Sequence, residues 1–176
     1  MHMDGARLMN AVVRSNRSAK ELVACCDTVS LCLSKGLGAP VGSVLAGGEE
    51  FIQKARRNRK LLGGGMRQVG ILAAAGLYAL EHHVDRLADD HRRAHDLAKI
   101  LSNYDEITVH EDRLDTNMVF LSISNKHRDP LYNFLIEQGV ILASPAEIMR
   151  CVTHLDIDDD ALSHIKTSID QYFAVA

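Results

Sequence analysis

Apolar residues recur along this chain in two patterns, one near the 3.6-residue helical period and one in short β-branched runs bounded by glycine. The longer helical pattern predicts helices, and the short runs predict strands. The predicted helices lie at 5–14, from 18 onward with Ser18 and Glu21 as a capping box, at 49–61, at 68–101 with a bend near 82–83, at 130–138 and at 158–173. The predicted strands lie at 28–33, 42–46, 107–110, 118–123, 140–142 and 149–153.

The pattern of predicted elements changes after residue 103, where short strands and short helices replace the longer helices. We therefore predict an α/β chain with a domain boundary near residue 102: residues 1–102 form one domain, and residues 103–176 form a small α+β domain. The run of small residues at 73–76 leaves room for another part of the chain to approach closely. A strand ending at Asp4 would be expected to have been cut away, because strands usually take about five or six residues.

Composition narrows the possible functions. The 176 residues carry a formal net charge of −3, which argues against binding to nucleic acid or to an anionic membrane. The basic run at 54–60 has no interleaved aromatic residues and is interpreted as a solvated helix face. The longest apolar run, 69–80, is too short to span a bilayer, and no signal peptide is apparent. We expect a cytosolic protein.

Cysteine and histidine spacing favours no metal site. The four cysteines match no zinc pattern and are interpreted as small buried side chains in a reducing compartment. His91 and His95 are four residues apart, but no glutamate completes a zinc-protease motif, so we interpret them and the pair at 82–83 as exposed helix residues.

Two short segments could carry chemistry. Lys35 follows a predicted buried strand and precedes a glycine-rich turn, and a lysine in a partly apolar setting has a lowered pKa that lets its amine attack a carbonyl. The alternative is a solvated loop lysine. Asp4 and Arg7, at a strand-to-helix turn, could orient a heteroaromatic cation and an anion, or they could be an acidic helix cap and a surface arginine.

Four ordered motifs together resemble a known family. Asp-Gly-Ala-Arg stands at 4–7, Leu-Ser-Lys-Gly-Leu-Gly-Ala-Pro-Val-Gly-Ser at 33–43, Gly-Gly-Gly-Met-Arg-Gln at 63–68 and Arg-Cys-Val-Thr-His-Leu-Asp at 150–156. They resemble the C-terminal half of the low-specificity L-threonine aldolases. These are pyridoxal-phosphate (PLP) lyases of the aspartate-aminotransferase-like fold, also called fold type I. The resemblance implies that residues 1–102 are the C-terminal part of the PLP-binding large domain.

The resemblance also implies roles for individual residues. Lys35 matches the lysine that binds PLP covalently, and Asp4 matches the carboxylate that pairs with the pyridine nitrogen. Arg7 matches a residue beside the cofactor ring. Arg67 matches a segment near the cofactor phosphate and the subunit interface, whereas Arg150 matches the arginine that grips the substrate carboxylate. The implied reaction cleaves threonine or allo-threonine to glycine and acetaldehyde, in a homodimer or homotetramer.

Chains of this family are considerably longer, and the missing part precedes Met1. We therefore expect a truncated form. The alternatives are a catalytically inactive fragment that pairs with a full-length subunit, and another fold type I PLP lyase, either serine hydroxymethyltransferase-like or β-eliminating. A nucleic-acid-binding module that uses the basic run at 54–60 is the least favoured reading.

Overall fold

The computed structural model describes residues 1–175, and these fold into two compact units. The first unit is Met1–Ala88, and the second begins at Asp89. The boundary lies near the start of helix α5 (Leu87–Leu101), because most of the buried face of this helix packs in the core of the second unit. The predicted domain boundary near residue 102 stays a prediction.

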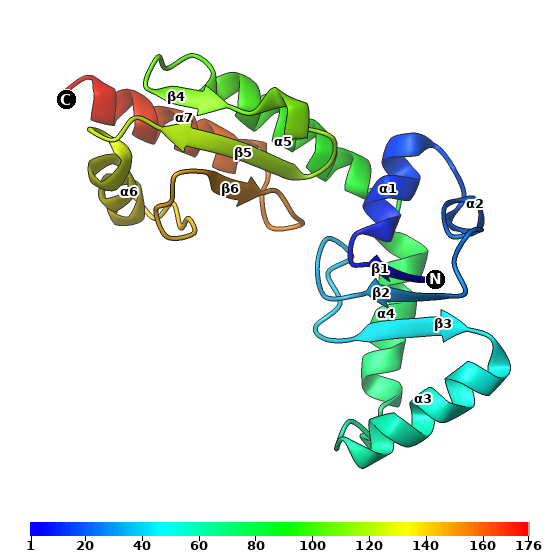
Figure 1. The fold of residues 1–176 in the computed structure, drawn as a ribbon. Coiled ribbons are helices and arrows are strands. Elements are labelled where there is room, and N and C mark those ends of the chain that lie inside the picture. Colours follow the sequence, from blue (N-terminus) through cyan, green and yellow to red (C-terminus); the bar gives the residue numbers. More distant parts are fainter. Residues whose placement is uncertain (176) are drawn as a thin grey trace. The chain divides into compact units, whose positions relative to one another are not determined.

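The first unit is built on a three-stranded sheet with the order β1-β2-β3 (Figure 1). Strand β1 (His2–Gly5) pairs in parallel with β2 (Thr28–Cys32), and β2 pairs antiparallel with β3 (Ser43–Gly47). Four residues of the strand that contains Asp4 are therefore present and paired, so the expectation that this strand would be cut away is wrong.

Helices connect and flank this sheet. The crossover from β1 to β2 consists of α1 (Leu8–Ser15) and α2 (Ala19–Leu22), and the predicted capping box at α2 is present. After β3 follow α3 (Glu49–Leu61), with the predicted bounds, and α4 (Gly70–His82). The buried core of this unit is small, and its members are Leu33, Leu37, Ala39, Ala79 and Leu87.

The second unit is a three-stranded antiparallel sheet with helices on one face. Strands β4 (Ile107–Val109), β5 (Met118–Ile123) and β6 (Met149–Val152) lie in that order. A single 3₁₀ turn, η1 (Glu111–Arg113), precedes β5. Along β5 every second residue is buried, which is the period expected of a strand with one covered face.

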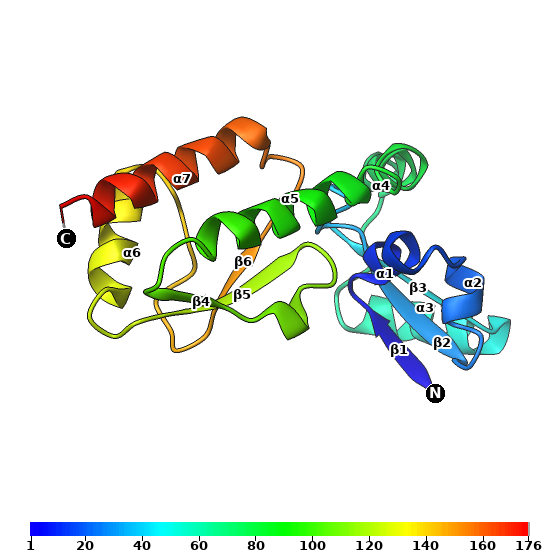
Figure 2. The same cartoon turned by 90° about the horizontal axis from the view of Figure 1, so that it is seen from above.

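Helix α5, α6 (Arg128–Glu137) and α7 (Asp159–Phe173) cover that face, and Figure 2 shows α5 and α7 on the same side of the sheet. The side chain of Asp158 caps α7 by accepting a hydrogen bond from the backbone N–H of Ala161 at 2.8 Å. None of the helices within residues 1–175 combines the length and the apolar content that crossing a membrane requires.

The predicted strand at 140–142 is absent, and the cap of α6 explains why. Gly139 adopts a left-handed conformation with φ 81°, and its N–H donates to the carbonyl of Ile136 at 3.0 Å. The N–H of Val140 donates to the carbonyl of Leu135 at 2.8 Å. The first backbone donor of the predicted strand, the Val140 N–H, thus helps to end the helix instead.

Two expectations about exposure are also wrong. His91 is buried within α5, with 7% of its surface exposed, and the adjacent Asp90 is buried as well. Among the four free cysteines, Cys25 is exposed and the other three are partly covered, so none is a fully buried core residue.

Candidate functional site

The parallel pairing of β1 and β2 brings two of the predicted site residues to one edge of the sheet. Figure 1 shows both strands running in the same direction, so their carboxyl ends meet. Asp4 is the third residue of β1, and Lys35 follows the last residue of β2 by three positions. Open α/β sheets characteristically bind ligands outside the carboxyl ends of their strands.

Gly5, which follows Asp4, is required for the two strands to approach each other. A Cβ atom at this position would lie 2.6 Å from the carbonyl oxygen of Ser30, a backbone atom of β2 that cannot move aside. The glycine of the Asp-Gly-Ala-Arg motif therefore allows β1 to pack against β2 and presents Asp4 at the sheet edge. This close approach is the physical reason for a small residue at that point.

Asp4 itself is exposed and held by its own turn. Its Oδ1 accepts a hydrogen bond from the backbone N–H of Ala6 at 3.1 Å. Arg7 is half-buried and occupies the N-cap position of α1, one residue before the helix begins. The acidic group and the arginine thus lie at the beginning of one helix, as the sequence predicts.

The loop that carries Lys35 is closed by backbone hydrogen bonds. The N–H of Gly38 donates to the carbonyl of Lys35 at 2.8 Å, and Gly38 has a φ of 72°, a conformation that favours glycine. At the base of the loop, the N–H of Leu33 donates to the carbonyl of Gly42 at 2.9 Å. Buried Leu37 anchors the loop beneath the lysine.

Helix α4 and the turn after it contact the same loop. The Nδ1 of His83 lies 2.6 Å from the carbonyl oxygen of Leu37, so this ring nitrogen donates, and the guanidinium of Arg86 reaches the carbonyl of Gly36 at 3.5 Å. Within the helix, a Cβ atom at Gly76 would lie 2.9 Å from the Cδ1 of Leu33. The predicted close approach at 73–76 is therefore present, and a leucine side chain makes it.

His83 was expected to be an exposed helix residue, and that expectation is wrong. It is half-buried, and its ring bonds to a residue 46 positions earlier in the chain. Local sequence could not reveal this contact, because neither the histidine pair nor the glycine-rich loop carries a signal that refers to the other.

Lys35 is exposed, so the partly apolar setting expected for it is absent. Its ammonium group nonetheless acts on a neighbour. Burial raises the pKa of the Cys32 thiol, but hydrogen bonding to Ser34 and the nearby charge of Lys35 outweigh burial and lower that pKa overall. The Cys32 Sγ lies 3.6 Å from the Ser34 Oγ. The cationic amine and a polarised thiol thus share the end of β2.

Arg67 is not brought to this edge. It is exposed in the turn before α4, whereas the Lys35 loop contacts the middle of that helix at Gly76 and its end at His83. At 1.5 Å per residue, these contacts are roughly 10 Å or more along the helix from Arg67. Arg67 makes no hydrogen bond or ion pair within the described part of the chain.

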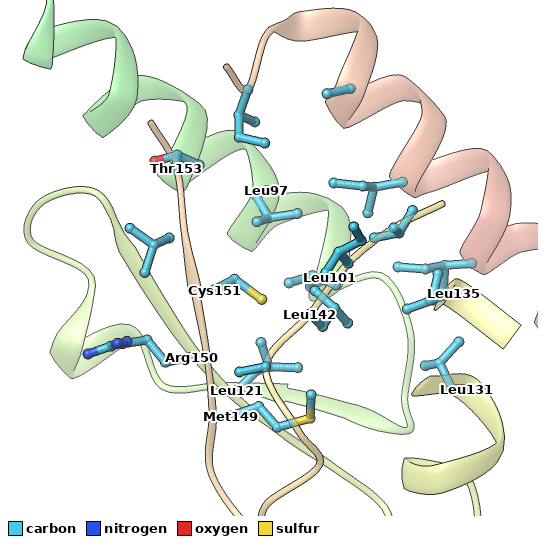
Figure 3. A pocket seen from close by; sticks show the side chains of 18 of the residues that line it. Leu97, Leu101, Leu121, Leu131, Leu135, Leu142, Met149, Arg150, Cys151 and Thr153 are labelled. Carbon is cyan, nitrogen blue, oxygen red and sulfur yellow. The ribbon is translucent and has the colours of Figure 1, made fainter. Parts of the chain in front are cut away.

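Arg150 belongs to the second unit. It lies on β6 directly opposite Phe120 of β5, and its side chain is exposed. Figure 3 shows the Arg150 side chain directed away from those of Met149 and Cys151, which face the core. The guanidinium of Arg113 lies 5.6 Å from the centre of the Phe120 ring. A second arginine therefore lies on the same face of this sheet as Arg150.

The rest of the matching motif at 150–156 is structural. Thr153 is buried, and its Oγ1 donates to the carbonyl of Asp90 at 2.7 Å. The side-chain amide of buried Asn117 donates to the carbonyl of Thr153 at 2.7 Å. The Nδ1 of His154 accepts a hydrogen bond from the backbone N–H of Asp156 at 3.3 Å. Residues 1–175 contain no group of acidic, histidine or cysteine side chains that could hold a metal.

Comparison with known proteins gives a consistent result. The profile of the beta-eliminating lyase family matches residues 1–124. A low specificity L-threonine aldolase from Escherichia coli O157:H7 is 46% identical over 166 residues, which is 94% of this chain and 48% of that protein. A probable low-specificity L-threonine aldolase 2 from Arabidopsis thaliana is 40% identical over 180 residues, covering 98% of this chain and 50% of that protein.

Solved structures share the fold. A putative L-allo-threonine aldolase from Listeria monocytogenes superposes with a TM-score of 0.80 at 21% identity and covers 97% of this chain and 51% of its own. A serine palmitoyltransferase from Sphingomonas wittichii gives a TM-score of 0.69 at 15% identity, covering 89% of this chain and 42% of its own. The chain spans about half the length of the curated relatives it matches, and its α/β architecture is correspondingly part of the fold type I arrangement.

Proposed function

Because this chain belongs to the beta-eliminating lyase family, whose members use PLP, we propose that it is the cofactor-lysine half of a threonine aldolase. The observation that supports this most directly is the parallel pairing that places Asp4 and Lys35 at one sheet edge. The complete enzyme would cleave threonine or allo-threonine to glycine and acetaldehyde.

The groups at that edge fit PLP by their chemistry. Lys35 offers an exposed primary amine for the cofactor aldehyde, and Asp4 offers a carboxylate for the ring nitrogen. Arg7 would lie beside the ring, at the beginning of α1. Bound PLP supplies an electron sink for the charge that develops at the substrate Cα.

Each protein group has a defined task in this proposal. The Asp4 carboxylate would accept a hydrogen bond from the ring nitrogen of bound PLP and would so favour the protonated ring. The Arg150 guanidinium binds the α-carboxylate of the amino acid with a planar, two-pronged contact and so orients the bond to be broken. Both groups would act by holding charge in place, and Arg150 is exposed and has no ion-pair partner within residues 1–175.

Arg67 is proposed to bind a cofactor phosphate across a subunit interface. Its separation from the Lys35 loop along α4 supports a role toward a neighbouring chain rather than its own. The exposed apolar side chains of α4, Ile71 and Leu77 among them, support a homodimer or homotetramer, because exposed apolar patches mark interfaces. We also place the enzyme in the cytosol.

The test is covalent labelling, which does not depend on turnover. The purified chain is mixed with PLP, reduced with borohydride and mapped by peptide mass spectrometry. A pyridoxyl group is expected on Lys35 and is expected to be lost in Lys35→Ala. Lys20→Ala is the matched control, since Lys20 is exposed on α2 and away from the sheet edge. Label confined to other lysines, or equal in both variants, would overturn the assignment.

Substrate choice separates the related lyases. We expect glycine and acetaldehyde from threonine once this chain is combined with the remainder of the enzyme. Formaldehyde from serine, or pyruvate from a β-substituted alanine, as the main product would instead indicate a serine hydroxymethyltransferase-like or β-eliminating enzyme. Co-purification with an intact subunit, without any labelling of Lys35, would favour an inactive interaction partner; the exposed apolar face of α4 is the observation that supports this second candidate.

A further inference from the structure

The second unit contains a cavity of about 420 Å³ between its sheet and its helices (Figure 3). Its walls are mainly branched aliphatic side chains from several elements, including Leu97, Leu101, Leu121, Leu131, Leu135 and Leu142. No Phe, Tyr or Trp side chain of the described residues lines it. The volume lies within the 300–1,000 Å³ range typical of small-molecule sites.

This cavity is distinct from the proposed carboxylate site. Arg150 contributes to the wall of the cavity, but its side chain points away from it, to the opposite face of the sheet. Met149 and Cys151, the neighbours of Arg150 on β6, turn their side chains toward the cavity instead. Strand alternation thus separates the two sites by the thickness of one sheet.

Two polar side chains of the cavity lining, Thr153 and His164, already have hydrogen-bond partners within the protein. The Thr153 hydroxyl donates to the carbonyl of Asp90 at 2.7 Å, and the Nε2 of His164 donates to the carbonyl of Gln138 at 2.9 Å. A buried water needs two to four polar partners, and the mainly aliphatic side chains of this lining offer few of them. The interior therefore favours an apolar occupant over water.

An unfilled space of this size is unfavourable. Protein interiors contain few voids larger than a water molecule, and the side chains around a void lose dispersion contacts on that side. The segment at 139–143 forms part of the wall without regular structure, and Ile141 within it is 87% exposed, so it does not fill the space.

We propose that this cavity binds a small aliphatic molecule. The branched aliphatic walls, which contain no Phe, Tyr or Trp ring, select that class of ligand. The inference does not depend on the proposed function, because the cavity lies wholly within the second unit and Lys35 lies in the first.

Cys151 provides a reporter inside the cavity. Its sulfur lies on the cavity side of β6 (Figure 3), and burial raises the pKa of its thiol to about 11. Cys25 is exposed and serves as an internal control in the same molecule. Peptide mapping after alkylation at pH 9 measures both rates at once.

The experiment uses 1-hexanol as the probe and 1,6-hexanediol as its polar counterpart. If one molecule occupies the cavity, 1-hexanol at ten times its Kd slows Cys151 alkylation about tenfold and leaves Cys25 unchanged. The diol has a hydroxyl at each end that the cavity cannot satisfy, so it protects much less. The melting temperature of the second unit should rise with 1-hexanol and not with the diol.

Variants test whether the site is the cavity. Ala161→Leu adds volume from the cavity wall and is expected to abolish protection, whereas Ala174→Leu changes an exposed alanine at the end of the same helix and is expected to keep it. If Ala161→Leu does not fold, the contrast between hexanol and diol decides. Equal slowing of both cysteines, equal protection by both probes, or no change in rate and melting temperature would overturn the proposal. Should Cys151 not react even in the free protein, an unchanged melting temperature would mean that the segment at 139–143 closes the space.

Discussion

The two units differ in how far they bury their apolar side chains. The second unit gathers fifteen buried residues into one core, whereas the core cluster of the first unit contains five within the described chain. The first unit does not lack apolar residues. In helix α4 only Gly76 and Ala79 are buried, while Ile71 and Leu77 are 80% and 60% exposed.

This difference shows which unit covers its apolar side chains with its own residues. A helix that is apolar on all sides is normally found inside a larger core. Strand β3, exposed along its whole length, shows the same property for the sheet. The first unit therefore has the sequence of an element within a larger assembly, and the second unit has the sequence of a self-contained small domain.

The strongest test of this contrast replaces one leucine in each unit. Leu131→Ala removes a side chain that is 1% exposed in the second unit, and it should lower the free energy of unfolding of that unit by about 2–5 kcal/mol. Leu77→Ala on α4, where the side chain is 60% exposed, should change stability by less than about 0.5 kcal/mol. Hydrogen exchange followed by mass spectrometry in urea reports each unit separately.

A large effect of Leu77→Ala in the isolated chain would contradict the contrast. It would mean that α4 is already covered. A small effect of Leu131→Ala would mean that the second unit collapses around the lost side chain.

The next test measures how tightly helix α4 packs against Leu33 in the first unit. Gly76→Val places a branched side chain against the Cδ1 of buried Leu33 and should destabilise the unit by about 1–3 kcal/mol through overpacking. Gly70→Val, at the start of the same helix, meets no atom within 4 Å and serves as the control. Thermal unfolding of both variants gives the comparison, and equal melting temperatures would show that the contact between Leu33 and α4 is loose.

Local sequence predicted most elements because their signals are local. The helix at Glu49–Leu61 and the strand at Met118–Ile123 have the expected bounds, since charged residues at the helix ends and strict alternation in the strand are visible within a few residues. The predicted strand at 140–142 failed because Gly139 diverts the backbone donor that follows it to the cap of α6. The hydrophobic period of a segment does not show whether its backbone donors bond to a neighbouring strand or to a helix cap.

The candidate site could be predicted from the sequence less completely than the fold. Motif resemblance singled out Asp4 and Lys35, but periodicity could not say that their strands are neighbours and parallel. The bond between His83 and Leu37 and the network joining Thr153, Asn117 and Asp90 connect residues far apart in the chain. Such contacts follow from the tertiary fold.

A smaller effect is expected from the histidine that supports the Lys35 loop. His83→Ala leaves the buried carbonyl of Leu37 without its donor and should cost about 1–2 kcal/mol locally. Hydrogen exchange should speed up in residues 33–42 and not in the second unit. His82→Ala is a matched control, because both rings contact Tyr78 but only His83 bonds to the loop. Equal exchange in the two variants would remove His83 from the support of the loop.

The smallest effect concerns the surface charges of the second unit. The guanidinium groups of Arg92 and Arg93 donate to the Oδ1 of Asp159 at 2.8 and 3.0 Å, and they lower the pKa of that carboxyl below its ordinary value. As the pH falls below about 3.9, the unfolded chain takes up a proton before the folded chain does, so the stabilisation present at higher pH is lost.

Asp159→Asn should therefore lower the melting temperature of the second unit slightly at pH 6, and the difference from the unsubstituted protein should shrink as the pH falls below about 3.9. High salt should reduce it as well, since Asp159 is 65% exposed. Asp160→Asn removes a charge from the same first turn of α7, where both carboxylates lie near the positive end of the helix. Within the described part of the chain, Asp160 has no arginine partner. A pH dependence that is equal for the two variants would assign the effect to the helix terminus, whereas a larger one for Asp159 would assign it to the two arginines of α5.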